Sequence, residues 1–177
     1  MNLEFRIQNS EFSKLVFIAL GSNLGDSRKI LSEAIVRLSA LSNGPLRESS
    51  LWETTPVDCP IDSPKFLNAI VAFVPQKGET PESLLAKLQK LETVFGRQPK
   101  RVLNEPRPLD LDLIAFGEET RNSPQFTLPH PRAHLRRFVL QPLAEITPDL
   151  ILPSQTKAVA ELLAGLPDDE HCVKVCW

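Results

Sequence analysis

The amino-acid sequence predicts an α+β fold, an antiparallel sheet with its main helices packed on one face. Two observations support this prediction. Segments typical of strands and helices follow one another in the order strand, helix, strand, strand, helix, strand, which is the ferredoxin-like plan. The chain has 177 residues, the usual size of one domain. We therefore expect a single domain over residues 15–177, preceded by an N-terminal extension, residues 1–14.

The first half of the chain supplies three of the predicted strands and one helix. Residues 15–20 form a continuous apolar run, which predicts a buried strand. Asp26 then stands where an N-cap is expected, before a helix whose apolar residues keep one face from 30 to 41. Residues 46–53 predict a second strand, and residues 66–74 predict a third that is apolar enough to lie inside the sheet.

The second half supplies the remaining elements. Thr80 followed by a proline is a helix start signal, and the apolar stripe after it predicts a helix that a glycine closes. Residues 110–116 predict a fourth strand. Beyond it we expect a helix from about residue 135, a short helix over about 157–163 and an edge strand over 173–177.

Proline is unusually frequent in this sequence. The chain holds 16 Pro against 7 Gly, and nine of the prolines lie between residues 99 and 153. Pro and Gly together still stay well below the share typical of disordered or collagen-like chains. We therefore expect long, stiff loops, and we predict that loops 54–64 and 97–108 are lids that become ordered when ligands bind.

Charge, hydropathy and cysteine content exclude several classes of protein. Twenty Lys and Arg against 22 Asp and Glu give a net charge of −2, which argues against nucleic-acid binding through bulk charge. No apolar run approaches the ~20 residues of a membrane span, and no signal peptide is indicated. We expect a cytoplasmic protein. Cys172 and Cys176 lack the partner cluster that a four-ligand zinc site needs, so we assign them to packing of the tail.

The basic residues are concentrated in two short segments, 97–107 and 130–137. Seven of the 20 basic residues lie there: Arg97, Lys100, Arg101, Arg107, Arg132, Arg136 and Arg137. The only acidic residue in the two segments is Glu105. Both a local binding site for anions and a solvated basic face are consistent with this pattern.

Two acidic residues lie on one face of the fourth predicted strand. Side chains alternate along a strand, so Asp110 and Asp112 point the same way, with Cα atoms ~6.6 Å apart, and can share hard cations such as Mg²⁺. A solvated acidic face is the alternative. The neighbouring basic residues favour a polyphosphate site, in which metal ions bridge phosphate oxygens and cationic side chains neutralise charge. A Walker-type phosphate loop is excluded because its motif is not in the sequence.

A second group of residues suits a flat ligand. Phe66 and Asn68 share one face of the third predicted strand, and the segment 54–57 and Phe138 complete the group. An aromatic ring stacks on a planar heterocycle, while an amide pairs with the donors and acceptors along its edge. In sequence alone, such a group more often reflects packing in the hydrophobic core.

Four motifs together resemble the 6-hydroxymethyl-7,8-dihydropterin pyrophosphokinases of folate biosynthesis. The motifs are Gly21-Ser-Asn-Leu-Gly-Asp26, Phe66-Leu-Asn68, Arg107-x-x-Asp110-x-Asp112, and Pro129-His-Pro-Arg followed by Arg136-Arg-Phe138. The resemblance runs from about residue 16 to residue 163, in the family's order. It implies transfer of pyrophosphate from ATP to the hydroxymethyl group of a reduced pterin, giving AMP and the pterin diphosphate.

The resemblance also implies which residues form the site. Two Mg²⁺ ions that bridge the phosphates of ATP would be held by Asp110 and Asp112. The implied catalytic residues are Arg97, Arg107, Asp110, Asp112 and Arg136. The implied contacts of ATP are Gln89, Glu92, Arg97, Lys100, Arg107, His130 and Arg136. The implied contacts of the pterin are Thr54, Thr55, Val57, Phe66, Asn68 and Phe138, with the two rings stacking on its faces.

The sequence departs from the family at two places. Many members have Trp-Gly-Pro-Arg where this chain has Asn104-Glu-Pro-Arg107, so we expect loop 97–108 to close over its ligands in a different way. The Tyr that follows the family's His is Pro131 here. The two aspartates of the signature are unchanged.

We therefore predict an ATP- and Mg²⁺-dependent pyrophosphokinase that binds small molecules, acts as a monomer and binds neither nucleic acid nor membranes. One alternative is another Mg²⁺-dependent nucleotide or phosphoryl transferase that uses the same aspartates, for which ADP or pyrophosphate would replace AMP as the product. The other is a ferredoxin-like RNA-binding module whose exposed strand aromatics stack on bases.

Overall fold

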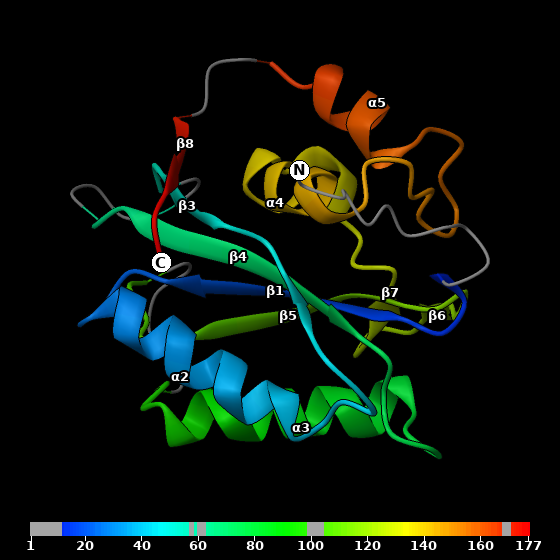
Figure 1. The fold of residues 1–177 in the computed structure, drawn as a ribbon, viewed down its shortest axis with the longest axis horizontal. Helices are drawn as coiled ribbons and strands as arrows, with labels where there is room; N and C mark the ends of the chain where they lie inside the picture. The colour runs from blue at the N-terminus through cyan, green and yellow to red at the C-terminus, as the bar shows by residue number, and fades with distance from the viewer. Residues whose placement is uncertain (1–11, 57–58, 60–62, 99–104, 168–170) are drawn as a thin grey trace.

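The computed structural model describes residues 12–56, 59, 63–98, 105–167 and 171–177 (Figure 1). Its centre is a six-stranded sheet in the order β5-β1-β4-β3-β8, with β2 also paired to β4, and every strand pair is antiparallel. The strands are β1 (Val16–Ser22), β2 (Arg47–Glu48), β3 (Leu51–Thr54), β4 (Phe66–Phe73), β5 (Asp110–Phe116) and β8 (Cys172–Val175). The predicted α+β, ferredoxin-like fold is confirmed.

The strand predicted over residues 46–53 is divided into β2 and β3. The division lies at Ser49, whose side-chain hydroxyl accepts a hydrogen bond from the backbone N–H of Ile70 at 2.9 Å. The regular ladder on β4 is interrupted at this residue because a hydroxyl, rather than a backbone carbonyl, receives that bond. A side chain that competes with the backbone ladder leaves no signal in the apolar pattern of a sequence.

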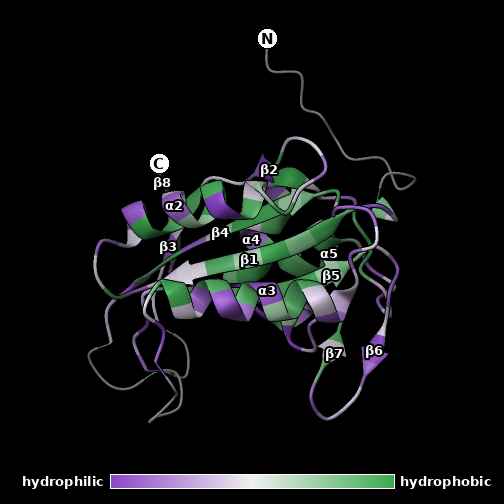
Figure 2. Ribbon diagram, turned by 90° about the horizontal axis from the view of Figure 1, so that it is seen from below, coloured by the Kyte–Doolittle hydropathy of each residue, from purple (hydrophilic) through white to green (hydrophobic). Residues whose placement is uncertain are grey.

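Two helices cover one face of the sheet, as predicted. They are α2 (Ser27–Ser39) and α3 (Pro81–Val94), and they lie side by side below the sheet in Figure 1. Both predicted caps are present, because Asp26 accepts from the N–H of Lys29 at 3.1 Å and Thr80 accepts from the N–H of Ser83 at 3.2 Å. Figure 2 shows a hydrophobic β1 between these helices, whose outer surfaces carry hydrophilic residues.

The opposite face is covered by the C-terminal part of the chain, an arrangement that the sequence did not predict. A short 3₁₀ helix, η1 (Ala133–Leu135), leads into α4 (Arg137–Ile146), and α5 (Val159–Ala164) packs beside it (Figure 1). The hairpin of β6 (Arg121–Asn122) and β7 (Thr127–Leu128) was also not predicted. Strands of two residues are too short to display an alternating pattern.

The alternation of side chains along β4 creates two hydrophobic cores. Ala69 and Val71 belong to the core under α2 and α3, whereas Ile70 and Ala72 belong to the core under α4 and α5. Phe66 and Asn68 therefore face the α4 side. By the same alternation, Asp110 and Asp112 share that side with Ile114 of the second core. Residues far apart in the sequence thus meet on one face of the sheet.

Residues near both ends of the described chain pack against the rest of the fold. Phe12, within the segment expected to be an extension, is buried in the α4-side core. The predicted C-terminal edge strand is present as β8, paired to β3. Among the residues that the structure describes, no helix is long and apolar enough to cross a membrane.

Candidate active site

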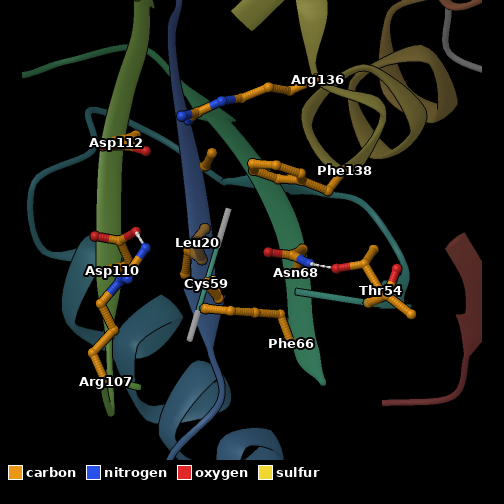
Figure 3. Close-up of a pocket in the computed structure, with 13 residues that line it drawn as sticks. Leu20, Thr54, Cys59, Phe66, Asn68, Arg107, Asp110, Asp112, Arg136 and Phe138 are labelled. Carbon is orange, nitrogen blue, oxygen red and sulfur yellow. Dashed lines mark hydrogen bonds and ion pairs between the residues drawn. The ribbon is translucent and has the colours of Figure 1, made fainter. Parts of the chain in front are cut away.

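A pocket opens on the α4 face of the sheet, where the C-terminal ends of β1 and β3 meet the N-terminal ends of β4 and β5 (Figure 3). Most of its lining residues are ones that the sequence singled out. The lining consists of Ala19, Leu20, Gly21, Thr54, Thr55, Cys59, Phe66, Asn68, Arg107, Asp110, Asp112, Arg136 and Phe138. The two groups of predicted site residues, the aromatic–amide group and the aspartate pair, therefore share one cavity.

One side of the pocket is neutral and is called the neutral wall below; it consists of Thr54, Phe66, Asn68 and Phe138. Phe66 is the first residue of β4 and Phe138 lies in the first turn of α4. Their rings lie on opposite sides of the Asn68 amide in Figure 3. Asn68 is buried, and its Nδ2 donates a 2.8 Å hydrogen bond to the hydroxyl of Thr54. The neutral wall is a slot between two rings with a fixed amide at its back.

Gly21 leaves room for that slot, a role that the sequence analysis did not assign to it. In the ladders of β1, Gly21 stands opposite Asn68 on one side and Asp110 on the other. A Cβ at this position would lie 3.1 Å from Oδ1 of Asn68 and 3.7 Å from the ring of Phe66. The signal in the sequence was a glycine at the end of an otherwise apolar strand, which marks a close approach by another group.

The other side of the pocket, the charged wall, is formed by Asp110, Asp112, Arg107 and Arg136, and Arg97 supports it through its ion pair with Asp110. Asp110 is paired with two guanidinium groups, Arg97 Nη1 at 2.6 Å and Arg107 Nη2 at 2.5 Å. Burial alone would raise the pKa of Asp110, but the guanidinium groups of Arg107 and Arg97 outweigh burial and lower it. Asp110 is therefore held as a carboxylate.

Asp112 differs from Asp110 in its electrostatic environment. Burial raises the pKa of Asp112, the charge of Asp110 raises it further, and His130 and Arg136 oppose the shift only in part. Figure 3 shows Arg136 extending from the start of α4 toward this carboxylate. Two carboxylates that repel each other on one strand face form a donor set that a hard divalent cation would stabilise.

The aspartate pair fits a Mg²⁺ site that the protein completes only in part. Within the described ranges, no cluster of three or more His, Cys, Asp and Glu side chains is placed to hold a metal ion. Mg²⁺ is commonly bound through one or two carboxylates, with water and substrate phosphates at the remaining positions. Asp110 and Asp112 match that pattern, so the residues present fit a metal that arrives together with a phosphate ligand.

Glu92 of α3 lies behind the charged wall. It is buried, accepts a hydrogen bond from the N–H of Leu111 at 2.7 Å and pairs with Arg97, which also contacts Asp110. Burial raises the pKa of Glu92 to about 7, against the opposing effects of Leu111 and Arg97. Glu92 therefore acts on the pocket through Arg97 and does not line it.

Two arginines of the charged wall lie against the aromatic rings of the neutral wall. The guanidinium of Arg136 lies 5.3 Å from the ring centroid of Phe138, and that of Arg107 lies 5.3 Å from the ring centroid of Phe66. His130 donates its backbone N–H to Ile114 at 2.9 Å, and burial lowers the pKa of its imidazole. Each ring of the neutral wall thus carries a cation of the charged wall against it.

Asn23, a residue of the first motif to which the sequence analysis assigned no role, joins the loops on either side of the pocket. Its Nδ2 donates to the carbonyl of Pro64 at 3.2 Å, and its Oδ1 accepts from the N–H of Arg107 at 2.9 Å. The side chain is buried. Asn23 therefore anchors Pro64, the last residue of loop 54–64, and the backbone of Arg107.

Four of the described residues that were predicted for the site do not line the pocket, namely Gln89, Glu92, Arg97 and His130. Gln89 is exposed on α3, one turn before Glu92, and does not line the pocket. Val57 and Lys100 lie outside the described residues, as does Asn104, where the chain departs from the family pattern. Cys59, in contrast, lines the pocket although no motif in the sequence indicated it.

Comparison with known proteins agrees with this geometry. Residues 17–148 match the family described as 7,8-dihydro-6-hydroxymethylpterin-pyrophosphokinase (HPPK). The chain is 37% identical over 153 residues to the 2-amino-4-hydroxy-6-hydroxymethyldihydropteridine pyrophosphokinase of Haemophilus influenzae, covering 86% of this chain and 92% of that protein. It is 38% identical over 135 residues to the protein of the same name from Bacillus subtilis, covering 76% and 78%.

Longer proteins contain a matching part. The chain is 36% identical over 169 residues to the Folic acid synthesis protein fol1 of Pneumocystis carinii, covering 96% of this chain but only 22% of that protein. A crystal structure of Plasmodium falciparum HPPK-DHPS has the same fold, with a TM-score of 0.66 at 14% identity over 85% of this chain and 45% of that chain. The family match over most of the chain and the bacterial relatives of similar length agree: the chain belongs to the 7,8-dihydro-6-hydroxymethylpterin-pyrophosphokinase family.

Proposed function

We propose that the pocket carries out the reaction of this family, with the pterin in the neutral wall and the phosphates of ATP against the charged wall. The chain is a pyrophosphokinase that uses ATP as co-substrate and transfers pyrophosphate to 6-hydroxymethyl-7,8-dihydropterin in folate biosynthesis. One observation supports the assignment of residues most strongly. The aromatic slot with its buried amide and the aspartate pair with its arginines line the same pocket.

The neutral wall suits recognition of the pterin. Phe66 and Phe138 offer faces on which a planar ring system stacks. Asn68 directs its Nδ2 to Thr54, which leaves Oδ1 as the acceptor on the side of Gly21. We propose that this oxygen accepts from an N–H group on the edge of the pterin and that Thr55 contacts the same edge. An amide oriented in advance costs less free energy on binding than one that must be ordered.

The charged wall suits a polyphosphate. Mg²⁺ bound to Asp110 and Asp112 would neutralise the charge of the phosphate oxygens. Arg97 and Arg107 are paired with Asp110 in the structure. We propose that in the complex these guanidinium groups leave the carboxylate and bind phosphate oxygens instead. Each guanidinium is planar and can donate to two oxygens at once. Arg136 and His130 border the same region and are proposed to contact ATP.

The chemical step follows from this arrangement. The hydroxymethyl oxygen of the pterin forms a bond to the β-phosphorus of ATP. The bond from that phosphorus to the oxygen bridging the α-phosphate breaks, and AMP leaves with the electron pair, while the hydroxyl proton is lost to solvent. The protein forms no covalent intermediate, because holding both substrates in line and stabilising charge provide the acceleration in such transfers.

Several finer expectations remain predictions within this proposal. They are two Mg²⁺ ions, a monomeric state, a cytoplasmic location, no binding of nucleic acid, and a single domain over residues 15–177. Mass analysis of the purified chain tests the monomer. Metal dependence at fixed ATP tests the number of ions.

The assay that tests the function measures AMP formation from ATP, Mg²⁺ and 6-hydroxymethyl-7,8-dihydropterin. We expect turnover by the wild type and a loss of at least ~10²–10³-fold in kcat for Asp110→Ala and Asp112→Ala, because each removes a ligand that stabilises phosphate charge. Asp149→Ala, an exposed aspartate beyond α4, is the matched control and should retain activity. ADP as the product, or full activity of either aspartate variant, would overturn the assignment.

A further inference from the structure

Glu145, near the end of α4, lies outside the pocket but holds three parts of the chain together. Its carboxylate accepts from the backbone N–H of Ser50 at 3.0 Å, the Ser50 hydroxyl at 2.7 Å and the indole Nε1 of Trp52 at 3.1 Å. It also pairs with Lys174 at 2.7 Å. Four donors on one side chain that is 26% exposed form an ordered connection between α4, β3 and β8.

The strand residues that Glu145 contacts stand directly beside the neutral wall. Trp52 is opposite Asn68 in the ladder of β3 with β4, and two residues further along β3 lies Thr54. Because side chains alternate along a strand, Trp52 and Thr54 face the same side, the side of α4. Lys174 is opposite Trp52 on the other neighbour, β8. Glu145 therefore contacts β3 next to the residue that orients the Asn68 amide.

Helix α4, which contains Glu145, also contains Phe138, the ring on the other side of the slot from Thr54. Phe138 and Glu145 are seven residues apart on α4, so they lie on similar faces of the helix, about 10.5 Å apart along its axis. At the N-terminal end of α4, Arg137 donates to the carbonyls of Leu166 at 3.3 Å and Pro167 at 2.9 Å. The helix is thus fastened at both ends, and the fastening at its C-terminal end is Glu145.

We propose that Glu145 is a positioning residue for the pterin: its carboxylate fixes the distance between the helix that bears Phe138 and the strand that bears Thr54. This inference rests on the proposed function, since it concerns the same slot. It predicts that loss of the carboxylate affects pterin binding selectively. The phosphate side should be affected less than the pterin side. Asp110 and Asp112 stand on β5, at the other edge of the sheet from β3 and β8, and of the charged wall only Arg136 adjoins α4.

The experiment compares kinetic constants of Glu145→Gln with the wild type, using 6-hydroxymethyl-7,8-dihydropterin and MgATP. The glutamine amide presents N–H groups where the carboxylate accepted from Ser50 and Trp52. We expect KM for the pterin to rise about five- to tenfold, while kcat and KM for ATP stay within twofold. Loss of folded protein alone would lower the apparent kcat and leave both KM values unchanged.

Two further variants complete the test. Glu82→Gln removes an exposed carboxylate that pairs with Arg121 at 2.5 Å on the α3 side, and it should leave all three constants unchanged. If Glu145→Gln does not fold, Trp52→Phe removes one donor while retaining a ring, and it should raise KM for the pterin two- to threefold.

Equal effects on both KM values, or an unchanged KM for the pterin in a folded variant, would overturn the positioning role. Wild-type protein that forms no AMP would instead contradict the proposed function itself. The two failures are therefore distinguishable, because the first appears only in variants of a working enzyme.

Discussion

The two walls of the pocket are stabilised in different ways. The neutral wall is held by packing and by a neutral hydrogen bond, the 2.8 Å contact from Asn68 to Thr54. The charged wall is held by ion pairs in which Arg97 and Arg107 both contact Asp110. The neutral wall already presents two ring faces and an acceptor to a ligand. The charged wall compensates the charge of Asp110 with two arginines, whereas the charge of Asp112 is opposed only in part.

This difference indicates how each half of the reaction is prepared. A planar ligand can enter the neutral wall with little rearrangement, so its binding free energy is not spent on ordering the site. A polyphosphate must instead break contacts between carboxylate and guanidinium before it makes its own. The exchange keeps every charge compensated. The arginines give up the carboxylate and gain phosphate oxygens, and the carboxylate gives up the arginines and gains a cation.

The largest predicted effect concerns Arg107, a residue of the charged wall that pairs with Asp110 and also contacts the ring of Phe66 in the neutral wall. Arg107→Ala should lower kcat about 10²–10³-fold, the usual loss when one donor to developing charge is removed. KM for the pterin should rise much less, since a partly exposed cation–π contact is worth only about 1 kcal/mol. Steady-state AMP formation measures both constants.

Arg132→Ala provides the control, because Arg132 is an exposed arginine of the other basic segment, 130–137, and does not line the pocket. It should keep kcat within twofold. If Arg107→Ala raised KM for the pterin more than it lowered kcat, Arg107 would belong to the neutral wall, and the division between the walls would be wrong.

The second effect is on stability and comes from Glu92, behind the charged wall. Its folded-state pKa of about 7 lies above the ordinary value of 4.5, so the folded protein binds this proton more tightly than the unfolded chain. The resulting stabilisation is complete below pH 4.5 and is lost as the pH rises through 7. Glu92→Gln cannot ionise and should gain up to about 3 kcal/mol of stability relative to wild type between pH 5 and pH 8.

Urea unfolding of both proteins at pH 5 and pH 8 measures this change. Glu33→Gln, on the exposed face of α2, should show no pH-dependent difference from the wild type. A stability difference between Glu92→Gln and wild type that is constant with pH would mean that Arg97 keeps Glu92 ionised throughout. The charged wall would then be stabilised by its internal ion pairs across the whole pH range.

The third effect tests the space in the neutral wall. Gly21→Ala places a Cβ 3.1 Å from Oδ1 of Asn68, so the amide must move by a few tenths of an ångström, whereas the 3.7 Å distance to Phe66 is an ordinary contact. Overpacking of this kind costs about 1–3 kcal/mol, and we expect KM for the pterin to rise about tenfold. KM for ATP should change little. The comparison variant is Gly78→Ala, at a positive φ of 85° with open space around it, which should lower Tm without changing either KM.

Much of the fold was predictable because local patterns and packing agree. The run that became β5 begins with alternating Asp and Leu and continues with three apolar residues, and its predicted bounds are those observed. The division at Ser49 and the short hairpin of β6 and β7 were not predictable. The division depends on the Ser49 hydroxyl, which meets Ile70 only in the folded sheet. The hairpin has only two residues in each strand, too few to show an alternating pattern.

The site was predictable where chemistry is carried by the residue type. Asp110 and Asp112 had to share a face because they stand two apart on a strand. The roles of Asn23 and Gly21 were not predicted, because each depends on a contact made across the fold. Asn23 bonds to Pro64 and Arg107. Gly21 leaves space beside Asn68. A sequence pattern reports which groups are present and does not report which loops they join.

The smallest predicted effect isolates the orientation of Asn68. Thr54→Val removes the hydroxyl that accepts from Nδ2 and leaves a methyl group of similar size beside a buried amide. An unpaired buried donor costs about 1–3 kcal/mol, part of which the amide avoids by rotating, so KM for the pterin should rise about fivefold with kcat unchanged. Thr54→Ser restores the hydroxyl and should restore KM. A different outcome is that Thr54→Val has no effect while Gly21→Ala raises KM for the pterin tenfold. In that case shape alone would select the pterin. The neutral wall would then have a preformed volume but no preformed hydrogen bond.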